Sequence, residues 1–258
     1  MRKAKKSPDG MTFLEHLEDL RKRIFYSFLA VVISVIPAWF FHKQLYYILA
    51  VPITKYLPEG KTLTFISLTA PFMLYIKVSF LAAILFASPF VFVQIWYFIS
   101  PGLYKKERTA VIPFVLFSSL FFISGAVFAY FIVFPFAVRF FLSMGEGFDP
   151  IITVDQYFTL ALRVILGIAL VFELPTLVYF FSRFGIITAK MMIKYFKYAV
   201  LVVFIIAAVI TPTPDPITQS IVAIPMLALY GLSILIALVV GKKKEKKRKQ
   251  EEEEDLAG

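Results

Sequence analysis

Long apolar runs separated by short polar segments dominate this chain of 258 residues. A helix needs about 20 apolar residues to cross a hydrocarbon core of roughly 30 Å. Four runs meet this length, the first is marginal, and the fifth provides only about 21 Å of helix between Lys197 and Pro212. The pattern therefore predicts an all-α membrane protein with six transmembrane helices, of which the fifth and sixth are short. We expect one membrane domain over 1–240, with spans near 24–41, 72–99, 110–138, 157–182, 198–211 and 217–240.

Lysine and arginine are distributed unevenly between the segments that join these runs. When alternate segments are grouped, one side of the membrane carries 21 of them and the other side carries 4. The positive-inside rule then predicts that both termini are cytoplasmic. Residues 241–258 form a basic block followed by an acidic block with no apolar face, so we expect a disordered cytoplasmic tail. Its basic part can lie against anionic headgroups of the bilayer.

Composition excludes most enzyme classes. Hydrophobic residues make up 60% of the chain, against about 45–50% in soluble domains. There is no cysteine and there are only two histidines, which removes thiolate chemistry and most metal sites. The spans contain no histidine and one carboxylate, Glu173, so an intramembrane protease is not indicated. We expect no catalytic residues, cofactor, metal or nucleic-acid partner.

Proline occurs in five of the six predicted spans. Each proline removes a backbone hydrogen bond and tends to kink its helix. Membrane helices tolerate such prolines without functional consequence. The alternative is a curved molecule with a concave face. No internal repeat is visible, which argues against an inverted-repeat transporter.

Two polar segments are expected at the cytoplasmic face. Thr12 and Glu15 form a capping box at the start of an amphipathic helix that leads into the first span, with Glu18 and Asp19 on its polar side. The second segment, 98–108, turns at a Pro-Gly pair and displays Glu107 among three cations.

These segments resemble the TatC family, the multi-spanning receptor subunit of the twin-arginine protein translocase. The similar stretches are His16-Leu-Glu-Asp-Leu-Arg-Lys-Arg23, Trp96-Tyr-Phe-Ile-Ser-Pro-Gly-Leu-Tyr-Lys-Lys-Glu-Arg108, Ala126-Val-Phe-Ala-Tyr-Phe-Ile-Val-Phe-Pro135, Phe172-Glu-Leu-Pro175, Thr211-Pro-Thr-Pro-Asp-Pro-Ile-Thr-Gln219 and Ala223-Ile-Pro225. Each motif alone is weak, but their order along residues 12–240 is that of the family.

The resemblance implies a membrane receptor that binds twin-arginine signal peptides and supports export of folded proteins, driven by the proton-motive force. It implies single-span TatA/TatB-type partner subunits and a bacterial-type inner membrane, and self-association is compatible with it. The implied signal-peptide site contains Glu107 with Asp19 or Glu18, because adjacent guanidiniums pair with planar carboxylates. Phe98 and Arg21 belong to the same two motifs. The alternative for these carboxylates is local pairing on a solvated helix face.

Polar residues within or beside the later spans are further candidates. Glu173 is expected to face protein or water, since a charge at mid-bilayer costs about 2.5–3.5 kcal/mol. It marks either a polar groove or a structural hydrogen bond. We expect Asp215 to cap the sixth span, and the resemblance places Asp215 and Gln219 where the family contacts its partners.

Two cations, Lys77 and Arg163, lie inside predicted spans near the outer boundary. Their long side chains can reach the headgroups, which is the simpler interpretation. The alternative function is a small secondary transporter or channel that uses Glu173, Lys77 and Arg163 together.

Overall fold

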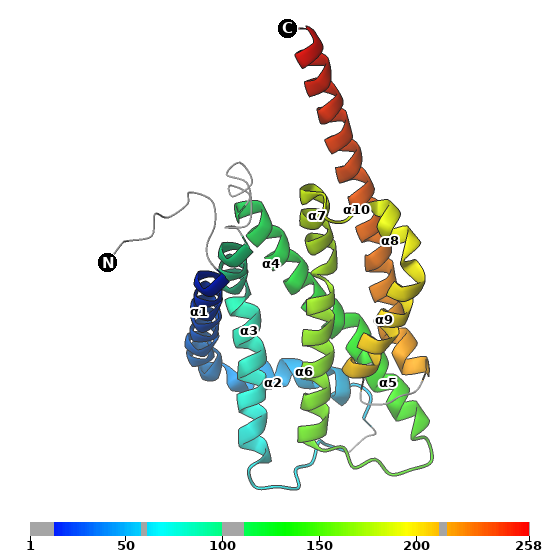
Figure 1. Cartoon of the computed structure of the whole chain (residues 1–258). Coiled ribbons are helices and arrows are strands. Elements are labelled where there is room, and N and C mark those ends of the chain that lie inside the picture. Colours follow the sequence, from blue (N-terminus) through cyan, green and yellow to red (C-terminus); the bar gives the residue numbers. More distant parts are fainter. Residues whose placement is uncertain (1–12, 58–60, 100–110, 212–215, 258) are drawn as a thin grey trace, which may run out of the picture.

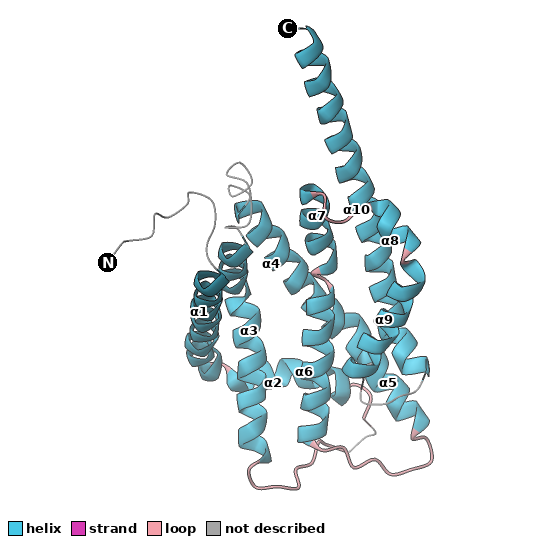
Figure 2. Ribbon diagram, in the orientation of Figure 1, coloured by secondary structure: helices cyan, strands magenta, loops and turns pink. Residues whose placement is uncertain are grey.

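The computed structural model describes residues 13–57, 61–99, 111–211 and 216–257 of the chain, and no strand occurs in these ranges. Figure 1 traces the helices from the N-terminus to the C-terminus, and Figure 2 shows that loops are confined to short connections. The helices are α1 (Phe13–Phe40), α2 (His42–Thr54), α3 (Ala70–Ile99), α4 (Val111–Phe128), η3 (Ala129–Val133), α5 (Phe134–Met144), α6 (Val154–Val171), α7 (Leu174–Phe184), α8 (Ala189–Lys194), α9 (Phe196–Ile210) and α10 (Pro216–Ala257).

The predicted all-α membrane fold is confirmed. Within the described ranges, five helical stretches are long and apolar enough to cross a membrane, and a sixth apolar helix, α9, has 15 residues. The sixth predicted span is not short, however, because its apolar stretch runs over 27 residues from Pro216 to Lys242. Pro225 lies inside this helix and does not interrupt it.

The tail beyond residue 240 also differs from the prediction. The sequence indicated disorder from 241 to 258, whereas α10 continues as a helix to Ala257. The segment lacks proline and consists mainly of lysine, glutamate, arginine and glutamine, which are strong helix formers. The charged segment therefore extends the last transmembrane helix away from the bundle (Figure 1).

Proline changes the helical geometry at two of the predicted positions. A five-residue π-helical turn, η3, precedes Pro135 at the start of α5. The fourth span divides into α6 and α7 just before Pro175, whose missing N–H cannot continue the helical ladder. Pro37, Pro89 and Pro225 remain inside continuous helices.

The helix α2 lies between the first two predicted spans, where the sequence predicts no helix. It lies across the bundle beside α3 and α6 (Figure 1). Leu49 and Ile53 are four residues apart and bury one face of α2 in the core. The hydroxyl of Tyr157 in α6 donates to the Leu49 carbonyl at 2.8 Å, and that of Tyr130 in η3 donates to the Ile48 carbonyl at 2.6 Å.

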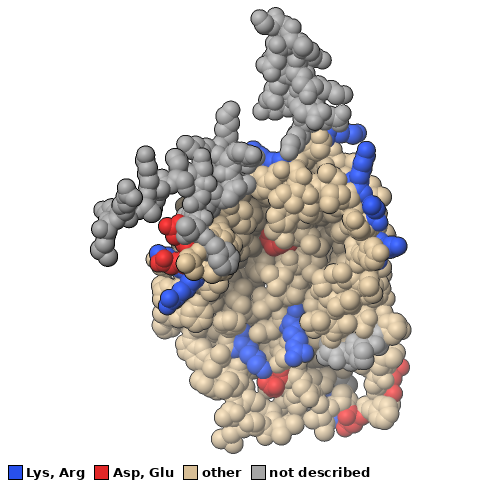
Figure 3. Space-filling model, in the orientation of Figure 1, with Lys and Arg blue, Asp and Glu red and all other residues tan. Residues whose placement is uncertain are grey.

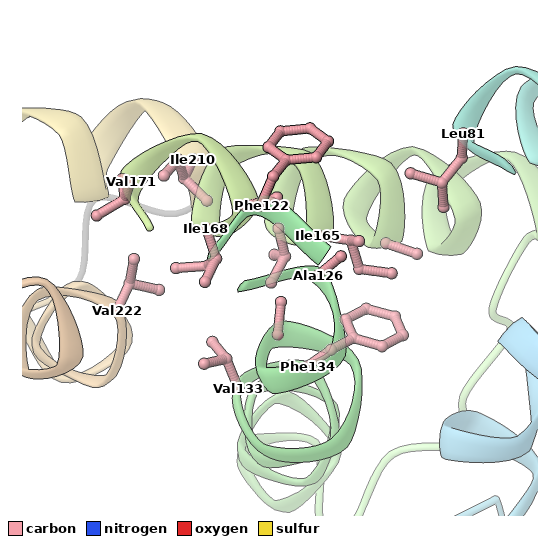
Figure 4. Packing of buried hydrophobic residues seen from close by; sticks show 14 of the residues in the cluster. Leu81, Phe122, Ala126, Val133, Phe134, Ile165, Ile168, Val171, Ile210 and Val222 are labelled. Atoms are coloured by element: carbon pink, nitrogen blue, oxygen red, sulfur yellow. The ribbon is translucent and has the colours of Figure 1, made fainter. Parts of the chain in front are cut away.

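The core is organised around α6. Figure 4 shows buried side chains of α6, including Ile165 and Ile168, between residues of α4 and η3 on one side and Ile210 and Val222 of α9 and α10 on the other. By contrast, α1 packs along α3 at the edge of the bundle, and no residue in its most apolar stretch is buried within the protein. A lipid environment accounts for that exposure.

Candidate functional site at the α1–α3 junction

The N-terminal part of α1 meets the C-terminal part of α3 through a guanidinium group. Arg23 of α1 pairs with Asp19 one turn earlier, with 3.2 Å between Nε and Oδ1. Its Nη1 donates to the Gln94 side-chain oxygen of α3 at 3.3 Å, and the guanidinium carbon lies 5.1 Å from the Tyr97 ring centroid. A carboxylate, an amide oxygen and an aromatic face thus surround one arginine.

The two candidate carboxylates of α1 have different surroundings. The Asp19 side chain is 17% exposed, and its Oδ2 is buried without a hydrogen-bond partner among the described residues. The Glu18 side chain is 66% exposed and pairs with Lys22 at 3.1 Å on the outer surface of the helix. Asp19 therefore faces the α1–α3 junction, and Glu18 faces away from it.

The other expected members of this site are distributed as follows. The Phe98 ring stacks on His16 of α1, with 4.5 Å between ring centroids and 23° between planes. Arg21 is exposed on α1. Glu107 and the Pro-Gly turn lie outside the described residues. The sequence did not identify Arg23 as the internal partner of Asp19, although their spacing of four residues allows such a pair.

Glu173 lies at the break between α6 and α7 and is 7% exposed. Its Oε1 accepts no hydrogen bond within the described part of the chain, and Ser118 of α4 faces the carboxyl group. The hydroxyls of Ser118 and Thr176 are also buried without hydrogen-bond partners among the described residues. A small polar cluster therefore lies inside an apolar section of the bundle.

Lys77 does not simply extend to the headgroups. It bridges α3 to α6 by donating to Asp155 at 2.5 Å and to the Thr159 hydroxyl at 2.9 Å. Arg163 lies one turn after Thr159 on α6, and the cavity that it lines also includes Asp155 and Thr159 in its wall. Glu173 lies ten residues further along the α6–α7 stretch, about 15 Å at the rise of a helix. Glu173 is therefore not brought together with the two cations of the transporter hypothesis.

Of the residues expected to contact partner subunits, Asp215 lies outside the described residues. Gln219 is half-buried in the first turns of α10. Nearby, α9 presents an apolar surface on which Leu201, Ile205 and Val209 are each more than half exposed. Figure 3 shows how few charged side chains occur between the two ends of the molecule on the face drawn there.

Comparisons with known proteins identify the family of this chain. The family model described as Sec-independent protein translocase protein (TatC) matches residues 15–225. A protein of that name from Koribacter versatilis is 43% identical over 234 residues, covering 90% of this chain and 86% of the relative. The chain belongs to the TatC family. A relative from Helicobacter pylori strain J99 is 41% identical over 223 residues, covering 86% of this chain and 87% of its own.

A solved TatC structure has the same fold. The crystal structure titled "Twin Arginine Translocase Receptor- TatC" is 38% identical, with a TM-score of 0.78, and the alignment covers 87% of this chain and 99% of the other. The predicted family is thus confirmed, and with it a multi-pass membrane protein of a translocase family rather than an enzyme.

Proposed function

We propose that this TatC protein binds twin-arginine signal peptides at the junction of α1 and α3, on the cytoplasmic side of a bacterial inner membrane. The observation that carries the proposal is the environment of Arg23, which already holds one guanidinium against Asp19, Gln94 and Tyr97. Groups that bind an internal arginine in this way have the chemistry needed to bind an arginine of a peptide.

Asp19 is the carboxylate that the geometry favours for this role. A buried carboxylate oxygen without a hydrogen bond is costly, and a guanidinium donor from a peptide would remove that cost. Glu107 follows α3 in the chain, so we propose it as the second carboxylate. Phe98 supports the site from α3 by stacking on His16, and the exposed Arg21 lies on the surrounding surface.

The test compares two neighbouring carboxylates. Asp19→Asn is expected to weaken binding of a twin-arginine peptide about tenfold or more, since a charge-assisted hydrogen bond contributes about 1.5–3 kcal/mol. Glu18→Gln is the matched control and should change the affinity by less than about twofold, as expected for an exposed pair. The measurement is the Kd of a labelled peptide with each purified variant, with a Lys-Lys peptide as the weak-binding reference.

Equal losses for Asp19→Asn and Glu18→Gln would contradict this assignment, as would unchanged affinity in a folded Asp19→Asn protein. Glu107→Ala, measured in the same assay, is expected to weaken binding about tenfold or more, since it too removes a charge-assisted bond. Unchanged affinity there would move the second recognition group elsewhere.

We further propose that the edge formed by α9 and the start of α10 receives the single span of a TatA/TatB-type subunit. The support is the exposed apolar surface of α9 and its length of 15 residues, about 22 Å, which is shorter than a typical hydrocarbon core. Asp215 and Gln219 would then lie at the rim where the partner enters. Together with the proton-motive force, such subunits would support export of folded proteins.

A further inference from the structure

A cavity of about 1050 Å³ opens between α5, α6 and the segment 145–153 that joins them. Apolar side chains form most of its wall, including Leu142 and Leu160. Phe148 and Ile151 of the joining segment also line it and are 80% and 76% exposed, so the cavity communicates with the surroundings of the protein. The cavity is remote from the α1–α3 junction, since α5 and α6 meet at the opposite end of the bundle (Figure 1).

Two arginines, Arg139 and Arg163, line this cavity. In the part of the chain that the structure describes, neither forms an ion pair. Two nearby carboxylates are already neutralised by lysines, since Asp155 pairs with Lys77 and Asp149 pairs with Lys61 at 2.8 Å. That leaves the two guanidiniums and the exposed Glu146, so the positive charge exceeds the negative charge around the cavity.

The arginines lie at a defined depth. The helical stretch that contains Arg163 begins at Val154 and has 31 residues, about 46 Å, and would extend about 8 Å beyond each side of a 30 Å core if centred. Arg163 is nine residues, about 14 Å, from that start, which places its Cα about 6 Å inside the core. Its long side chain can return the guanidinium to the boundary.

Arg139 reaches the same boundary from α5. Its helical stretch, Val111–Met144, has 34 residues, and Arg139 lies five residues, about 8 Å, before the end. Both charges therefore lie at the level where lipid phosphates occur, and the apolar wall of the cavity lies beside them. An anionic headgroup with an acyl chain matches both features, since guanidinium binds phosphate in a bidentate manner.

We propose that this cavity binds one anionic phospholipid, with Arg139 and Arg163 holding its phosphate and with Leu142, Leu160 and Phe148 lining the path of an acyl chain. The lipid would fill the space between α5 and α6 at the end of the bundle opposite the α1–α3 junction. The proposal does not depend on signal-peptide binding, because no residue of the two sites is shared.

The test uses the full chain in nanodiscs of phosphatidylcholine that contain a small fraction of a photoactivatable phosphatidylglycerol. Wild-type protein should be labelled at residues of the cavity wall, and unlabelled phosphatidylglycerol should compete about tenfold or more better than phosphatidylcholine. Arg139→Gln with Arg163→Gln should remove that preference. Arg183→Gln, an exposed arginine at the far end of the α6–α7 stretch, is the matched control and should retain it.

A third variant separates loss of the site from loss of the fold. Leu160→Trp fills the apolar part of the cavity and leaves both arginines in place, so labelling of the wall should fall while the protein remains monodisperse. Equal competition by the two lipids in wild-type protein would overturn the proposal, and so would unchanged labelling in the double arginine variant. If soluble glycerol phosphate reduced labelling of the cavity wall as effectively as lipid does, the cavity would be a free phosphate site instead. If only a bound signal peptide protected the cavity wall from labelling, the cavity would be a peptide site.

Discussion

Glu173 has a carboxyl group at a position where the helix that carries it is interrupted. The break before Pro175 frees backbone groups, and Ser118 and Thr176 add hydroxyls within the same apolar surroundings. Because unpartnered buried polar groups are destabilising, we infer that a polar group from a peptide or a partner helix completes this cluster during transport.

Substitution of Glu173 tests whether hydrogen bonding or charge matters there. Glu173→Gln retains the size and most of the hydrogen bonding, so it should retain transport if the group acts while neutral. Glu173→Ala should abolish transport, measured as export of a folded twin-arginine reporter. Binding of signal peptide at the α1–α3 junction should survive in both variants. Full export with Glu173→Ala would refute the inference, and loss of membrane insertion would assign the carboxyl group a structural role.

Individual residues also show which contacts the sequence alone does not predict. Asp19 and Glu18 are adjacent and chemically alike, and only the packing of α1 on α3 directs one into the junction and the other outward. The pairing of Lys77 with Asp155 joins residues 78 positions apart, and periodicity within one helix carries no information on such contacts. The same is true of Arg139 and Arg163, which line one cavity from different helices.

At the scale of elements, α4 and α6 approach each other closely at Gly125. A Cβ atom placed there would lie 2.7 Å from Cβ of Phe172 and 2.8 Å from Cα of Ala169. The second of these atoms belongs to the backbone, so the helices would have to separate. This crossing positions the helix break and Glu173 against Ser118.

Gly125→Ala is therefore expected to reduce stability by about 1–3 kcal/mol, the cost of overpacking a tight core. Gly231→Ala is the matched control, because a Cβ atom at that helical position meets nothing within 4 Å. It should be neutral or stabilising by up to about 1 kcal/mol, since alanine favours helix over glycine. The measurement is the thermal unfolding midpoint in detergent, and equal midpoints for the two variants would contradict the close crossing.

Elements defined by long apolar runs could be predicted from the sequence, because a bilayer imposes helix and length together. The ends of α3 agree with prediction to within two residues. Shorter helical elements could not be predicted from the sequence in this way. The helix α2 is stabilised by its contacts with η3 and α6 rather than by its length. The π-helical turn η3 is a local change of backbone geometry before Pro135.

At the scale of the whole molecule, the helix ends divide into two groups. The start of α1, the end of α3 and the end of α7 lie at one end of the bundle, and the joining segments 61–69 and 145–153 lie at the other (Figure 1). Those two segments are connected, since the Thr64 amide donates to the Ile152 carbonyl at 3.0 Å and the Val154 amide donates to the Thr64 carbonyl at 2.8 Å. The basic segments belong mainly to the first group.

This division predicts the topology when it is combined with the excess of lysine and arginine. Alkaline phosphatase fused after residue 60 or 147 should be active, because both positions follow an outward crossing, and fusions after 188 or 250 should be inactive. The decisive position is 214, between α9 and α10, because α9 has 15 residues and spans about 22 Å. We expect activity there, since the bilayer can thin to match a short helix at a cost of fractions of a kcal/mol per Å. Green fluorescent protein fused at the same positions is the complementary control and should give the reverse pattern, and a cytoplasmic signal at 214 would mean that α9 does not cross the membrane.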